Sequence, residues 1–232
     1  MRSLNKVQVI GDRLLVHTDL DAPRGRLCIA PLSAPTNWQT LIAEGEDTLQ
    51  TVVGVARRLY AVYSHAASHR VRIHAADGTN LRDIVLPGLG SVNRNEGSGV
   101  ISGVSGAWQG DDVWVSFTSY VHPPSIYRYD FETDYLAPYH VPDVGLDPAE
   151  YITTQVWYES PDGTRVSMFL VHHRNVTRDG RRPVRLTGYG GFNISVAPRF
   201  TLMELIRSAG RVDKLYATSV FAMQASNEVG FS

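Results

Sequence analysis

The 232-residue sequence lacks several features that mark particular classes of protein. Its single cysteine, Cys28, excludes an intramolecular disulfide framework and any metal site built from several cysteines. A net charge of −1 means that the chain has no excess of positive charge with which to bind nucleic acid or an anionic membrane. No apolar run approaches the roughly 20 residues of a membrane span, and residues 1–11 are too short and polar for a secretory signal. We therefore expect a cytoplasmic globular protein that uses no metal or other cofactor and binds neither nucleic acid nor membrane.

The first 140 residues contain an internal repeat. Each copy has a strand rich in β-branched and aromatic residues, a polar loop and a second strand. The copies are RLLVHTDLDAPRGRLCIAPL from Arg13, RLYAVYSHAASHRVRIHAAD from Arg58 and DVWVSFTSYVHPPSIYRYDF from Asp112, with starts 45 and then 54 residues apart. Apolar and polar residues alternate within the strands, as at Val71 and Ile73, and this period of two is typical of β-structure.

Further strands are predicted beside each pair, over residues 38–43, 51–55, 80–86 and 100–108, with tight turns at Gly11, Asp77 and Gly110. Four short strands in about 45 residues is the unit of a β-propeller blade. A β-sandwich with repeated hairpins is the alternative. A propeller ring closes with roughly 4–8 blades, so three blades predict part of a larger architecture. Such an open arc exposes strand edges and apolar faces, and we expect poor stability.

A different pattern follows the linker that Pro142 and Pro148 punctuate. The predicted elements are a strand over 153–158, a turn at 161–163, a strand through Val166, Met168 and Leu170, a strand over 184–187 that ends in Gly188, and a helix from Phe200 through Met203 and Ile206 to a C-cap at Gly210. A β-rich repeat thus gives way to the opening of an α/β domain.

Within this part, SPDGTRVSMFLVHHRNVTRDGRRPVRLTGYGGFNISVAPRF resembles the start of the catalytic α/β-hydrolase domain in the prolyl oligopeptidase family of serine peptidases. DLDAPRGRL and TSYVHPPSIYRYD resemble loops of late propeller blades in the same family, and the likeness covers roughly residues 10–206. The resemblance implies a mainly β chain: the last blades of a β-propeller over 1–147, then the first strands and helix of the hydrolase domain over 148–232. From about residue 208 the tail does not resemble the family. An altered reading frame or a truncated gene product would explain this.

The family cleaves short proline-containing peptides after proline, and the resemblance implies two site residues. Tyr189 matches the tyrosine whose hydroxyl stabilises the oxyanion, and Phe192 matches an aromatic wall of the substrate-binding pocket for proline. The glycines around them permit a sharp turn at the end of a strand. Without the resemblance, the same residues describe a strand-to-helix turn with two packing aromatics.

The Ser, Asp and His of the family's catalytic triad have no counterpart in these 232 residues, which contain no G-x-S-x-G motif. Ser98 in EGSGV and Ser105 in GVSGA each miss one glycine and lie in the repeat. We therefore predict a peptidase that is inactive as this chain alone. The alternatives are a propeller-based protein-binding module and one half of a split peptidase that a complementing chain completes. The histidines at 65, 69, 74, 172 and 173 have no metal-site spacing.

Overall fold

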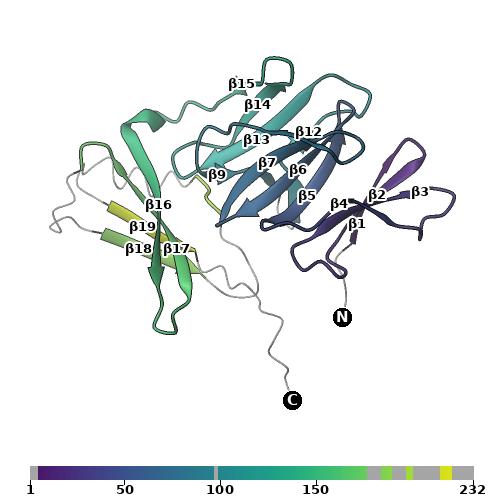
Figure 1. The fold of residues 1–232 in the computed structure, drawn as a ribbon. Coiled ribbons are helices and arrows are strands. Elements are labelled where there is room, and N and C mark those ends of the chain that lie inside the picture. The colour runs from purple at the N-terminus through teal and green to yellow at the C-terminus, as the bar shows by residue number, and fades with distance from the viewer. Residues whose placement is uncertain (1–4, 97–98, 177–183, 190–196, 201–214, 221–232) are drawn as a thin grey trace.

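A computed structural model describes residues 5–96, 99–176, 184–189, 197–200 and 215–220 (Figure 1). Two four-stranded antiparallel sheets and one five-stranded antiparallel sheet follow one another along the chain. The first blade contains β1 (Asn5–Ile10), β2 (Arg13–Thr18), β3 (Arg26–Pro31) and β4 (Gln39–Ile42). The second blade contains β5 (Thr48–Val55), β6 (Arg58–His65), β7 (Ser68–His74) and β8 (Asn80–Asp83). The third blade contains β12 (Val104–Ser105), β13 (Val113–Ser119), β14 (Ser125–Asp130) and β15 (Tyr135–His140), and β9 (Gly90–Ser91) also pairs with β13.

The repeat predicted from the sequence is the middle pair of strands in each blade. The two faces of β6 show why its sequence is apolar at nearly every position. Leu59 and Ala61 belong to the core shared with the first blade, whereas Tyr60 and Val62 belong to the core shared with the third. Both faces are covered, so these side chains are at most 1% exposed. Each large apolar side chain buried in this way contributes about 1.5–3 kcal/mol.

The strand predicted over 100–108 is two short strands in different sheets. β11 (Gly99–Ser102) pairs with β10 (Asn93–Glu96) in a separate ribbon, while β12 joins the third blade. The backbone turns at Gly106, where φ is +154° and an added Cβ would lie 2.3 Å from the carbonyl oxygen of Asp112. A side chain at this position would clash, so the glycine ends the strand.

The two ends of the blade series expose apolar side chains. Val7 and Val9 on β1 are exposed, as are Tyr135 and Tyr139 on β15. β15 was not predicted because it contains Pro138, which interrupts a strand pattern in sequence and is tolerated on an edge strand. Exposed apolar groups at both ends agree with the expectation of an open arc.

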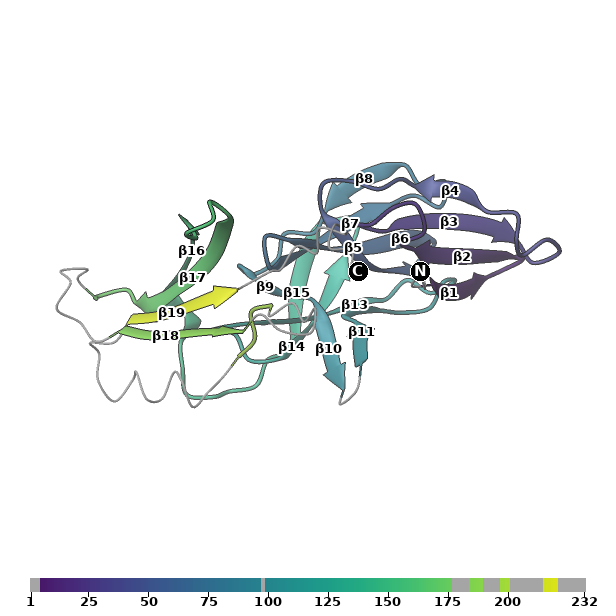
Figure 2. The same cartoon turned by 90° about the horizontal axis from the view of Figure 1, so that it is seen from below.

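A fourth sheet follows residues 141–147 and a single 3-10 turn over Pro148–Glu150. Its strands, in spatial order, are β16 (Tyr151–Glu159), β17 (Arg165–His173), β19 (Leu215–Val220) and β18 (Val184–Tyr189). The predicted hairpin is confirmed, with Gly163 at φ +82° in its turn. β18 and β19 are parallel, and the other pairs are antiparallel. This mixed sheet lies at the end of the molecule next to the third blade (Figures 1 and 2).

The predicted helix falls almost entirely outside the described residues. Only its start, at Phe200, is described, in an irregular segment over 197–200. β19 lies in the tail that does not resemble the family, where the sequence predicts a strand over 215–221. Within the described ranges, no helix has the length and apolar character needed to cross a membrane.

Candidate functional site

The backbone places Tyr189 at one edge of the mixed sheet. Tyr189 is the last residue of β18 and lies opposite Val220, the last residue of β19, while Gly188 lies opposite Ser219. The two strands are parallel, so their carboxyl ends meet at the same edge. Open sheets with parallel strands bind ligands beyond these carboxyl ends. The side chain of Tyr189 and the whole of Phe192 lie outside the described residues.

The mixed sheet is anchored to the blades through Phe169 at the middle of β17. This side chain is 0% exposed and packs in one cluster with Ala67, Leu89 and Tyr120. Its ring centroid lies 5.5 Å from that of Tyr120, at an interplanar angle of 55°. Ala67 belongs to the β6–β7 turn and Tyr120 follows β13, so one side chain joins the mixed sheet to two blades.

A second anchor holds the chain just beyond the glycine-rich turn. The hydroxyl of Ser91 on β9 donates to the carbonyl oxygen of Pro198 at 2.6 Å. The backbone N–H of Phe200 donates to the Thr118 hydroxyl at 3.3 Å, and the Phe200 ring packs against the cluster of Val121 and Val171. The chain is therefore held on both sides of residues 190–196: by β18 before them and by the third blade after them.

Two histidines close to this junction are neutral structural groups. His69 accepts a hydrogen bond at Nδ1 from the backbone N–H of Val92, at 3.0 Å, and burial lowers the pKa of this imidazole. The Nδ1 atom of His122 lies 2.8 Å from the hydroxyl oxygen of Ser119, and burial lowers the pKa of His122 as well. Both shifts favour the uncharged ring near pH 7.

The Ser119–His122 pair is not a nucleophile and its base. Ser119 is 2% exposed, so a substrate carbonyl cannot reach its oxygen. The same oxygen accepts the backbone N–H groups of Val121 and His122, at 3.2 and 3.0 Å, which closes the turn after β13. A serine that caps a buried turn in this way stabilises the loop.

Of the two serines whose surroundings lack one glycine of the G-x-S-x-G motif, Ser98 lies outside the described residues. Ser105 is exposed on β12, opposite Trp114 of β13. Its place in an antiparallel blade differs from the strand-to-helix turn that carries a nucleophile in α/β-hydrolases.

Three further histidines have local partners. His65 contacts Asp47 at 2.6 Å, His74 contacts the Gly78 carbonyl at 3.0 Å, and His172 contacts the His173 carbonyl at 2.9 Å. Within the part of the chain that the structure describes, no three His, Cys, Asp or Glu side chains are grouped so that they could hold a metal ion. Cys28 is a buried free cysteine.

Sequence reasoning did not identify the anchoring residues. Phe169 follows the alternating pattern of β17, so its burial could be predicted, but its partners could not. Ser91 and Thr118 are small polar residues in different segments, and only the approach of residues 197–200 gives them a role.

Comparisons with known proteins agree with this architecture. Residues 4–142 match the family model of the prolyl oligopeptidase N-terminal β-propeller domain. A prolyl endopeptidase of Elizabethkingia meningoseptica is 34% identical over 206 residues, which cover 88% of this chain and 28% of that protein. Prolyl oligopeptidase A of Galerina marginata is 29% identical and is covered over 27% of its length. The chain thus spans between a quarter and a third of the length of these relatives.

Solved structures give the same result. A prolyl endopeptidase structure superposes with a TM-score of 0.80 at 31% identity, over 94% of this chain and 31% of that one. Prolyl oligopeptidase B of Galerina marginata gives a TM-score of 0.78 at 23% identity and supports the fold alone. These matches confirm the prediction of propeller blades and argue against the β-sandwich alternative.

Proposed function

Because the chain belongs to the prolyl oligopeptidase family, we propose that it supplies propeller blades and the opening of the catalytic domain to a serine peptidase. The reaction would be hydrolysis of short proline-containing peptides after proline. The observation that carries this proposal is the end of β18, where the G-Y-G-G-F-N motif begins at the carboxyl edge of a parallel strand pair. Relatives that match 88% and 86% of this chain are named prolyl endopeptidases.

Tyr189 would stabilise the transition state. A phenol held at the carboxyl edge of the sheet can donate a hydrogen bond to the oxygen that becomes negative when the peptide carbonyl is attacked. A donor of this kind is typically worth about 3–4 kcal/mol. Phe192 would bind substrate, because an aromatic ring offers a flat apolar face to the proline ring.

The two anchors support this assignment. An oxyanion donor is effective when it is positioned before the reaction begins. Phe169 fixes the sheet against the blades, and the Ser91–Pro198 hydrogen bond fixes the chain on the far side of the turn. These contacts would hold the motif in place between the propeller and the catalytic domain.

We expect no turnover from this chain alone. An oxyanion donor and a pocket wall supply neither the nucleophile nor its base. The purified chain is assayed with a chromogenic peptide that releases its dye on cleavage after proline, beside a heat-denatured sample. Turnover that co-purifies with the chain through two different columns would overturn this expectation. Turnover that appears only with a second polypeptide would favour the split-peptidase alternative.

The role of Tyr189 is tested in a chimaera. Residues 151–200 replace the matching segment of the Elizabethkingia meningoseptica prolyl endopeptidase, and Tyr189→Phe is then introduced. We expect kcat to fall about 100- to 1000-fold with a small change in KM, since the lost interaction exists mainly in the transition state. Tyr158→Phe in the same segment is the matched control. Equal kcat for the two variants would refute the assignment.

A further inference from the structure

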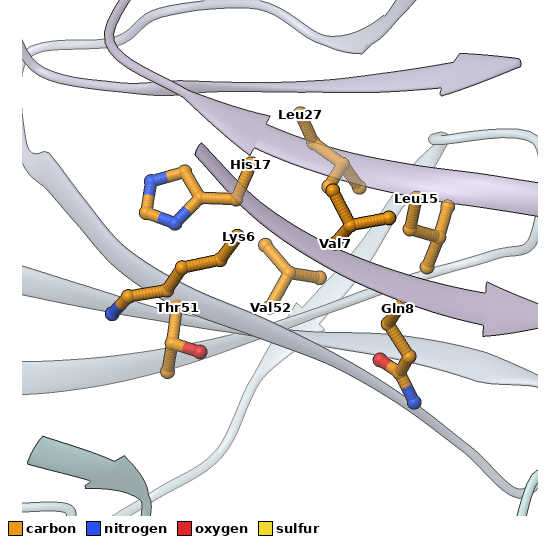
Figure 3. A pocket seen from close by; sticks show the side chains of 8 residues that line it. All are labelled: Lys6, Val7, Gln8, Leu15, His17, Leu27, Thr51 and Val52. Atoms are coloured by element: carbon orange, nitrogen blue, oxygen red, sulfur yellow. The ribbon is translucent and has the colours of Figure 1, made fainter. Parts of the chain in front are cut away.

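A pocket of about 190 Å³ lies between the first and second blades, away from the mixed sheet. The polar residues that line it are Lys6 and Gln8 of β1, His17 of β2 and Thr51 of β5. Its apolar lining comes from Val7, Leu15, Leu27 and Val52 (Figure 3). About six water molecules would fill this volume at their liquid density. A ligand of this size has a short body and room for a single charged group.

The pocket contains an unsatisfied buried group. His17 is 7% exposed, and its Nδ1 makes no hydrogen bond to any described residue. The backbone of Leu49 hydrogen-bonds the ring, on the side of Nε2. A buried polar atom without a hydrogen-bond partner is energetically unfavourable. Nδ1 is therefore the ring atom that a ligand can satisfy.

Lys6 lies next to this atom. Lys6 and His17 are direct cross-strand partners, and one ring nitrogen of His17 faces the Lys6 side chain in Figure 3. The Lys6 ammonium contacts only the Gln50 carbonyl, at 3.4 Å, among the hydrogen bonds of the described chain, and the residue is exposed. Its side chain can therefore move toward a ligand in the pocket.

The charges favour an anion. The lining residues include one cation and no acid. Burial, followed by the positive charge of Lys6, lowers the pKa of His17, while the Leu49 backbone and Asp19 oppose this shift. A bound carboxylate would neutralise Lys6 and accept a hydrogen bond from a protonated Nδ1. Both effects raise the pKa of His17, so binding takes up a proton.

We propose that this pocket binds a small carboxylate with a short aliphatic body, through the Lys6 ammonium and the His17 imidazole. The apolar side chains of Leu15, Leu27 and Val52 would contact the aliphatic part. The proposal is independent of the peptidase assignment, because no residue of the mixed sheet takes part.

The test uses isovalerate as the probe and its neutral amide as the control. Lys6 and Lys214 are the two lysines of the sequence, so NMR spectra of protein labelled at lysine and histidine contain two lysine ε-CH2 signals, which Lys6→Gln assigns, beside the histidine ring signals. We expect isovalerate to shift the Lys6 and His17 signals saturably, to leave Lys214 unmoved, and to bind at least tenfold more tightly than isovaleramide. Affinity should rise from pH 8 to pH 6 as the complex takes up a proton.

Two variants complete the experiment. Lys6→Gln should weaken isovalerate binding at least tenfold, whereas Lys214→Gln, the matched control, should leave it unchanged. Equal affinity for isovalerate and its amide would refute recognition of the carboxylate. Absence of saturable shifts at Lys6 and His17 in the unmodified chain would refute the site itself, whatever the variants do.

Discussion

The fully buried side chain of Phe169 lies in the junction between the mixed sheet and the blades, and Phe169→Ala tests its contribution. Phe169 is 0% exposed and contacts three segments that are distant in sequence. Truncation of a buried phenylalanine to alanine costs about 3–5 kcal/mol. The tilted ring pair with Tyr120 adds roughly 0.5–1.5 kcal/mol beyond the area that it buries. We therefore expect a loss of about 4 kcal/mol in the free energy of unfolding of the mixed sheet.

Urea denaturation and amide hydrogen exchange measure this loss. With a slope of about 2 kcal/mol per molar urea, the midpoint for the mixed sheet should fall by about 2 M. Exchange of the β17 amides should accelerate by about three orders of magnitude, while that of β6, in the centre of the blades, changes far less.

Two variants control for the substitution itself. Phe169→Leu keeps most of the apolar volume and should cost less than half as much. Trp157→Ala removes a larger ring that is 48% exposed on the neighbouring strand β16, and it should cost under about 1 kcal/mol. If Phe169→Ala were no more destabilising than Trp157→Ala, the reasoning about this junction would be wrong.

Two further predictions concern the blades. Gly78→Ala should destabilise the chain by about 1–3 kcal/mol, because φ is +88° and the new Cβ would lie 2.3 Å from the Leu41 carbonyl oxygen. Gly88→Ala is the control, since a Cβ added there has nothing within 4 Å. Similar melting temperatures for the two variants would contradict the prediction. Stability should also fall with pH below the ordinary histidine pKa of about 6.5, by on the order of 1 kcal/mol per pH unit for each histidine whose pKa burial lowers. His69 has a lowered pKa because it is buried, so as the pH falls this histidine takes up its proton in the unfolded chain before it does so in the folded chain. Its contribution to stability is therefore fully present above pH 6.5. Urea midpoints between pH 7.5 and 5.0 measure this effect. His69→Asn should flatten the dependence of the midpoint on pH, whereas the exposed His140→Gln should not. An unchanged dependence on pH in His69→Asn would exclude His69 as a source of the effect.

The strand pairs of the blades could be predicted because their signals are local. The segments from Arg13, Arg58 and Asp112 alternate with a period of two, and each became the central hairpin of a blade. The strand over 100–108 could not be predicted correctly, because its division depends on pairing with different segments: β11 pairs with β10, whereas β12 pairs with β13. The end of β12 has a similar cause, since Gly106 is visible in the sequence but the Asp112 carbonyl that an added Cβ would meet is not.

The candidate site shows the same division. The G-Y-G-G-F-N motif identifies the family from residues that are contiguous, and hence it points to Tyr189 and Phe192 directly. The contacts that hold this motif join Ser91 to Pro198 and Phe169 to Tyr120, over long sequence separations. No short pattern encodes them.

The sequence by itself determined the β-rich repeat, the hairpin before the motif and the family, because each follows from side-chain periodicity or from a contiguous stretch of residues. Only the tertiary structure decided that β19 lies between β17 and β18, and that an unpartnered imidazole nitrogen of His17 lies beside Lys6 in a pocket between two blades. The physical reason is that strand order, burial and hydrogen-bond satisfaction depend on which distant segments approach one another. The sequence around a residue does not reveal which distant residue it will contact.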